Sequence, residues 1–136
     1  MSLILCALIA AVANFILGAV WHMPLFGKKW GMALGMTVPA NPDMKPMYVR
    51  MGINFVANFV MAFGTFLIFA NFGVGNFLQA LVVSGVIFIG FIIPVLVVTN
   101  LWNGRPTKDA LTLFLISFGY YLINFVIWAL LFTWLV

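Results

Sequence analysis

The sequence predicts an all-α integral membrane protein, folded as a four-helix up-down bundle with a short interfacial amphipathic helix between spans one and two. Of the 136 residues, 66% are hydrophobic and only 6% are charged, whereas about a quarter of the residues in a soluble domain are charged. Every charged side chain lies within 28–50 or 105–109. The remaining stretches have too few polar residues to form a water-exposed surface, so we expect lipid around them.

The lengths of the uncharged stretches predict the number of spans. A membrane-spanning helix needs about 20 apolar residues, so the first and last stretches each provide one. As one helix, residues 51–104 would be about 80 Å long, and the Gly and Asn residues at 71–76 predict a turn that divides them. The apolar runs are continuous, which favours helices over a β-barrel. We expect spans at about 2–23, 50–71, 76–101 and 108–135 within a single membrane domain.

The positions of Lys and Arg predict the orientation. All six lie in or beside the connections 24–49 and 102–107. The positive-inside rule then places both connections in the cytoplasm and both termini outside. The same basic connections have the composition that binds anionic lipid headgroups, although orientation alone already accounts for them.

The first connection has two parts. Apolar residues spaced by four, at Phe26, Trp30 and Leu34, predict a helix over 25–36 that lies in the membrane interface. Residues 37–46 contain three prolines and predict an extended loop.

Small and polar residues recur at helical spacing on one face of three spans, which leaves two interpretations open. They hold helices together, because amides hydrogen-bond across helix contacts in membranes, or they line a polar pocket or pathway. Spans one, two and four supply the candidates for a ligand site or pathway, which are Asn14, His22, Asn54, Asn58, Tyr121 and Asn124.

Two further positions carry a structural and a functional interpretation. Pro94 frees the carbonyl of Gly90, which predicts a kink in span three that either aids packing or acts as a hinge. His22 is the one side chain whose ordinary pKa lies near neutrality. It is expected to bond a backbone carbonyl at the interface, with a pH-sensing or ligand-contacting role as the alternative.

Several chemistries lack the residues that they need. The chain has no Glu, and both Asp residues lie in or beside the predicted connections, so a carboxylate proton relay is excluded. The single His and single Cys are expected at opposite membrane faces, where they cannot share a metal ion. Ser84 and Ser117 lack a nearby base. We therefore expect no enzyme activity, no cofactor, no metal and no nucleic-acid partner.

The segment from Gly18 to Trp30 resembles the family catalogued as domain of unknown function 1761. The matching residues are Gly18, Trp21, Pro24, Phe26, Gly27, Lys28 and Trp30, with weaker matches at Pro94, Asn100, Arg105, Gly119 and Tyr120. His22 stands where the family frequently has tyrosine. The resemblance implies a small bacterial membrane protein with four helices, and it implies no activity, because the family is uncharacterised.

Physically, the segment that carries the resemblance is an interfacial clamp. Trp21 and Trp30 are expected at the lipid headgroups, while Pro24 ends the span and Gly27 allows the chain to turn. If the segment is functional, it frames the cytoplasmic mouth of a cavity. The mouth candidates are Trp21, Trp30, Asn100 and Arg105.

Three functional hypotheses follow. The first is a protein that binds or transports a small neutral or amphipathic molecule through a polar-lined bundle. The second is an accessory subunit that packs against a larger membrane complex, and the third is a membrane enzyme. We expect membrane lipids as partners, and a homo-oligomer is plausible because four helices enclose little space. A cavity lined by Asn14, Asn58 and Asn124 would favour the first hypothesis.

Overall fold

The protein is described by a computed structural model, which covers residues 1–36, 41 and 43–136. Within these ranges the regular elements are all helical. In chain order they are α1 (Leu3–Val20), the π-helical turn η1 (Trp21–Leu25), α2 (Gly27–Leu34), α3 (Lys45–Asn71), α4 (Phe77–Ile87), the π-helical turn η2 (Phe88–Ile92), α5 (Ile93–Leu101) and α6 (Thr107–Leu135).

The helices combine into four segments that are long and apolar enough to cross a membrane. Two of them are single helices, while α1 continues into η1, and α4, η2 and α5 form one continuous helix. The segments are Leu3–Leu25, Lys45–Asn71, Phe77–Leu101 and Thr107–Leu135. The predicted all-α bundle is confirmed, and the chain has the features of a multi-pass membrane protein.

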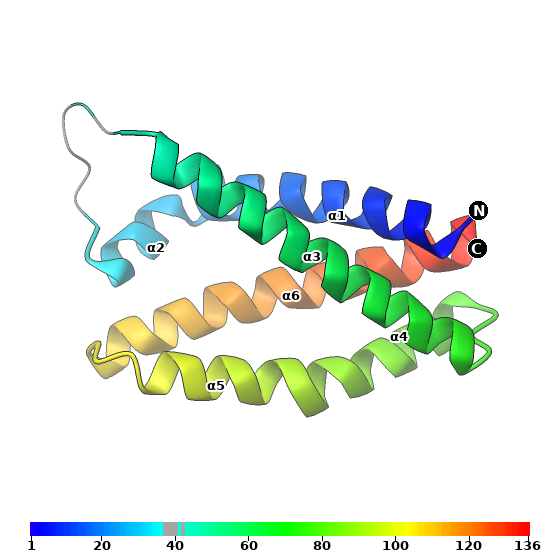
Figure 1. Ribbon diagram of the computed structural model, residues 1–136. Helices are drawn as coiled ribbons and strands as arrows, with labels where there is room; N and C mark the ends of the chain where they lie inside the picture. Colours follow the sequence, from blue (N-terminus) through cyan, green and yellow to red (C-terminus); the bar gives the residue numbers. More distant parts are fainter. Residues whose placement is uncertain (37–40, 42) are drawn as a thin grey trace.

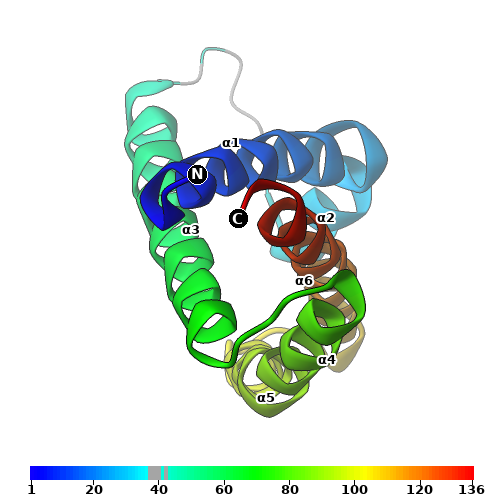
Figure 2. The ribbon, with the colours of Figure 1, turned by 90° about the vertical axis from the view of Figure 1, so that its right-hand side faces the viewer.

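The four segments run up and down between two ends of the bundle (Figure 1). Both termini and the turn between α3 and α4 lie at one end, and α2 and the turn between α5 and α6 lie at the other. We call the second the basic end, because it contains Lys28, Lys29, Lys45, Arg50, Arg105 and Lys108. Seen from the end with the termini, α6 lies between α1 and α4 (Figure 2).

Local sequence explains where α3 begins and ends. Pro46 occupies the first turn of α3, where its missing N–H disrupts no helical bond. The helix therefore includes the last two residues of the predicted loop 37–46, whose residues 37–40 and 42 lie outside the described part of the chain. At the other end Gly73 adopts a left-handed φ of +64°, and the Asn76 side chain accepts a hydrogen bond from the Gln79 N–H (3.0 Å) to begin α4.

The kink predicted around Gly90 and Pro94 takes the form of a π-helical turn. Gly90 lies within η2, and Pro94 follows at the start of α5. Because Pro94 has no N–H to donate, the helix widens in the preceding turn and continues with regular geometry afterwards. The structure brings Gly90 and Pro94 into one local distortion, and their action as a hinge stays a prediction.

The core is tightest in the half of the bundle near the termini. Helix α6 contacts α1, α2, α4 and α5, whereas α3 packs mainly on α1. The rings of Phe66 and Phe69 on α3 lie 5.5 and 5.1 Å from the ring of Phe132 on α6. Facing them on α1 are residues with small side chains, Cys6, Ala7 and Ala10, all fully buried. Small side chains on α1 thus allow its neighbours to approach closely.

Enlarging a buried alanine of α1 tests this packing. Ala10→Leu is expected to lower the free energy of unfolding by about 1–3 kcal/mol, because the added side chain has no space. The matched variant Ala19→Leu places the same side chain at an exposed position of α1 and should change stability little. Unfolding by denaturant in detergent micelles measures both, and equal effects would contradict the close packing.

Candidate functional site

The side chain of Asn14 joins three of the four spans in the interior of the bundle. Its Nδ2 donates to Oδ1 of Asn58 on α3 (2.6 Å). Its Oδ1 accepts from Nδ2 of Asn124 on α6 (2.6 Å) and from the hydroxyl of Tyr120, one turn earlier on the same helix. All four side chains are buried, and Asn14 and Asn124 are completely so. We call this set the Asn14 network.

The amide of Asn58 on α3 uses both its oxygen and its nitrogen in hydrogen bonds, whereas the amide of Asn124 on α6 uses only its nitrogen in the described part of the chain. Nδ2 of Asn58 donates to the carbonyl of Asn54 (2.9 Å), while the Asn54 side chain itself is exposed. Oδ1 of Asn124 is buried without a partner in the described part of the chain, as are Nε1 of Trp128 and Oγ of Ser84. The hydrogen bonds of Asn14 join α1 to α3 and α6, which agrees with the packing interpretation, and the pocket or pathway interpretation stays a prediction.

Tyr120 occupies the place that the sequence assigned to Tyr121. The predicted face of span four combined Tyr121 with Asn124. In the structure the buried residues of α6 include Ile116, Tyr120, Asn124 and Trp128, which are spaced by four, and do not include Tyr121. Tyr121 is half-buried and packs its ring 5.1 Å from that of Tyr120. Counting back four residues from Asn124 would have identified Tyr120.

The predicted interfacial clamp packs against α6. The indole Nε1 of Trp21 donates to the carbonyl of Ile116 (2.9 Å), and the indole ring covers Gly119, where a Cβ would lie 2.8 Å from Cζ2 of Trp21. Pro24 lies inside the π-helical turn η1. The chain turns after it, and α2 packs against α6. The clamp thus joins the end of the first span to α6.

His22 belongs to the clamp segment and contacts the Asn14 network. Its Nδ1 lies 3.0 Å from the carbonyl oxygen of Gly18. Its ring packs edgewise on Trp30 of α2 and on Tyr120 of α6, with centroids 5.2 and 5.1 Å away. Tyr120 therefore contacts His22 through its ring and Asn14 through its hydroxyl.

Asn100 and Arg105, the other two candidates for the cytoplasmic mouth, also lie at the basic end, but their hydrogen bonds are local to their own segments. Asn100 donates its Nδ2 to the carbonyl of Leu96 in its own helix (2.8 Å). Arg105 is half-buried in the turn between α5 and α6, where its N–H bonds the Asn103 side chain (3.1 Å). The structure therefore brings Trp21, His22 and Trp30 together, and holds Asn100 and Arg105 by contacts local to α5 and the following turn.

A cleft of about 550 Å³ opens between α2 and α6 at the basic end. Its polar lining consists of Lys29, Lys108, Asp109 and Thr112, and its apolar lining of Phe26, Met32, Ala33, Leu115 and Ile116. The cleft therefore combines charged groups with an apolar wall. The sequence identified α2 as an interfacial helix but did not show that its residues would line a cleft with the first turns of α6.

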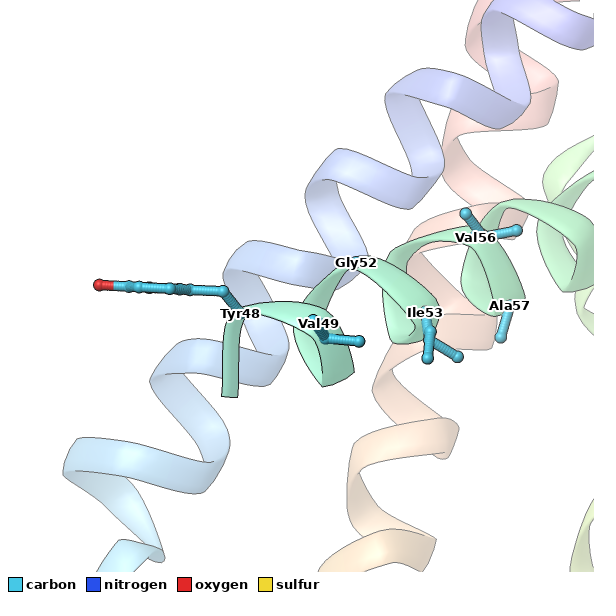
Figure 3. A pocket seen from close by; sticks show the side chains of 6 residues that line it. All are labelled: Tyr48, Val49, Gly52, Ile53, Val56 and Ala57. Carbon is cyan, nitrogen blue, oxygen red and sulfur yellow. The ribbon is translucent and has the colours of Figure 1, made fainter. Parts of the chain in front are cut away.

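A second hollow of about 550 Å³ lies along the outer face of α3. Its lining consists of Tyr48, Val49, Gly52, Ile53, Val56 and Ala57, all from one helix. Figure 3 shows Val49, Ile53 and Ala57 on one side of α3 and Val56 on the other. This surface is nearly all apolar and suits lipid chains or another helix. The α2–α6 cleft is the better candidate for a specific site, because it offers charge as well as apolar surface.

Metal chemistry receives no support from the side chains that the structure describes. Among them, no three or more His, Cys, Asp or Glu residues are grouped so as to hold an ion.

The Asn14 network predicts that replacing Asn14 lowers the free energy of unfolding more than replacing Asn124 does. Asn14→Leu removes three side-chain hydrogen bonds and should lower the free energy of unfolding by about 2 kcal/mol, at about 0.6 kcal/mol or more for each bond. Asn124→Leu removes one bond and an unpaired carbonyl, so it should cost less. Asn54→Leu at the exposed position is the control. Denaturant unfolding in micelles checks the order, and an equal loss in all three variants would contradict it.

The contact between Trp21 and Gly119 predicts that a single methyl group at 119 is harmful. Trp21 cannot move aside without losing its bond to Ile116, so Gly119→Ala should be less stable than Gly85→Ala by about 1–3 kcal/mol. Position 85 has nothing within 4 Å of an added Cβ, and alanine there should gain up to about 1 kcal/mol of helix propensity. Thermal unfolding of both variants provides the comparison, and a stable Gly119→Ala protein would show that the clamp is loose.

Comparison with known proteins identifies a family but no activity. Neither the curated proteins nor the solved structures give a match to this chain. A family model described as a protein of unknown function (DUF1761) matches residues 5–133, which is nearly the whole chain. The chain therefore belongs to the DUF1761 family.

Proposed function

We propose that this protein binds a small amphipathic molecule in the α2–α6 cleft, at the cytoplasmic face of a bacterial inner membrane. The observation that carries the proposal is the division of the cleft lining. Charged and polar groups are contributed by Lys29, Lys108, Asp109 and Thr112, and apolar side chains form the rest. The hollow on α3 has the same volume of about 550 Å³ without charged residues, so the mixed lining of the cleft carries the proposal and its volume does not.

The proposed orientation places the basic end in the cytoplasm and both termini outside. It is supported by the gathering of the Lys and Arg residues at one end of the bundle. Exposed tryptophans near the ends of two spans mark the two interfaces of the membrane. Trp102 follows α5 at the basic end and is 80% exposed, and Trp134 near the C-terminus is 90% exposed. Tryptophan is enriched at both interfaces of a membrane.

Passage of a molecule through the centre of the bundle receives less support than binding at its edge. The three central asparagines hydrogen-bond to one another through Asn14, so a molecule that used them would have to break these bonds first. Binding in the cleft requires no such opening.

The second candidate function is that of an accessory subunit. It is favoured by the outer face of α3, where Val49, Ile53 and Val56 are each more than half exposed around Gly52. An apolar face with a glycine allows the close approach of another membrane helix.

Filling the cleft tests the proposed function. Native mass spectrometry of the protein, gently extracted from its own membrane, should detect a co-purified amphipathic molecule. Thr112→Trp places a large ring in the cleft and should remove that molecule, and Ala33→Trp provides a second variant that fills it from α2. Ala57→Trp, which fills the hollow on α3 instead, is the matched control. Thermal unfolding checks that each variant is folded.

Two outcomes would contradict the proposed function. Wild-type protein without any bound molecule is one. Equal binding in folded Thr112→Trp and Ala57→Trp protein is the other. A discrete complex with other polypeptides that Ala57→Trp disrupts would support the accessory role instead.

A further inference from the structure

We propose that the α2–α6 cleft recognises an anionic phospholipid, with Lys29 and Lys108 binding its phosphate. This inference rests on the proposed function and names the class of molecule. The two lysines line one cleft from different elements, since Lys29 belongs to α2 and Lys108 to the first turn of α6. Two lysines that line one cleft from two helices offer six N–H donors to a negatively charged oxygen cluster bound there.

The charge balance of the cleft favours an anion. Asp109 is the one acidic residue of its lining and offsets one of the two lysines, so one positive charge remains. The start of α6 adds to this charge. The residue that precedes the helix, Pro106, provides no side-chain cap, and the positive end of the helix dipole favours an anion beside the first turn. A headgroup with a net negative charge therefore gains more from these features than a zwitterionic one, whose own cation the excess positive charge would repel.

The apolar wall of the cleft identifies the anion as part of a lipid. Phe26, Met32 and Ala33 come from the α2 side, and Leu115 and Ile116 lie about two turns further along α6 than Lys108. Along α6 the lining thus changes from charged to apolar, in the direction that leads from the basic end into the apolar part of the span. A phosphate beside the lysines would leave its acyl chain against this wall, whereas free phosphate would leave the wall unused.

The clamp gives the cleft a defined shape. Ile116 lines the cleft, and its carbonyl accepts the hydrogen bond from Trp21. The ring of Trp21 packs 4.8 Å from the ring of Phe26, which lines the cleft from the other side. Trp21 thus contacts both walls and holds them at a set separation. The segment that carries the family motif therefore builds the proposed lipid site.

Lys28 provides a matched control, because it lies beside Lys29 on α2, is also exposed, and does not line the cleft. Attraction of lipid by overall positive charge would depend on Lys28 as much as on Lys29. Binding in the cleft would depend on Lys29 and Lys108 alone.

The experiment is a titration of the detergent-purified full chain with phosphatidylglycerol and with phosphatidylcholine of the same acyl chains, followed by native mass spectrometry. We expect tighter binding of phosphatidylglycerol. Lys29→Gln and Lys108→Gln should each weaken it about five-fold, the size expected for one lysine at an anionic lipid surface. Lys28→Gln should change it less than two-fold, and Asp109→Asn should strengthen it.

Three outcomes would overturn the inference. These are equal binding of the two lipids, an equal effect of Lys28→Gln and Lys29→Gln, and binding of inorganic phosphate as tight as that of the lipid. The variant Thr112→Trp separates this inference from the proposed function. If Thr112→Trp removes a bound molecule and the lysine variants do not, the cleft binds a neutral amphipathic molecule and only the lipid assignment fails. If folded Thr112→Trp protein binds phosphatidylglycerol like the wild type, both fail.

Discussion

The structure depends most on the side chain of Asn14. In a membrane, helices gain little from burying apolar surface against one another, because lipid chains are equally apolar. Directional contacts therefore decide which helix faces meet. Asn14 contacts Asn58 on α3 and both Tyr120 and Asn124 on α6, so one amide sets the rotation of three spans. The fourth span joins through α4 and α5, which pack on α6.

Small side chains make this arrangement possible. Ala7 and Ala10 on α1 are fully buried, and Gly18 leaves only the room that the Tyr120 hydroxyl needs, since a Cβ there would lie 3.2 Å from its oxygen. Gly119 does the same for the ring of Trp21 on the opposite helix. Close approach brings the polar groups into contact, and the polar groups then hold the helices in register. Neither feature alone would define one arrangement.

The two ends of α6 pack against different helices. Near the termini its aromatic residues pack with those of α3 in a closed core, with Phe132 against Phe66 and Phe69. At the basic end α6 packs with α2 instead and leaves a cleft with Lys108 at its rim. The Asn14 network lies between these regions and separates the closed core from the open end. This division explains why a binding site is expected at the edge of the bundle rather than along its axis.

The residue pattern alone predicted the all-α fold, the number of spans, the turn at 71–76, the position of α2 and the distortion around Pro94. These features depend on apolar length, on Gly and Pro, and on the spacing of charges, all of which are local. It also identified Asn14, Asn58 and Asn124, because a polar residue in a long apolar run stands out. Three features became visible only in the folded chain: Tyr120 rather than Tyr121 joins these asparagines, the Asn54 side chain stays exposed, and Lys29 and Lys108 line one cleft. The rotation of a helix and the pairing of distant segments arise from contacts between spans, which a linear pattern of residues does not contain.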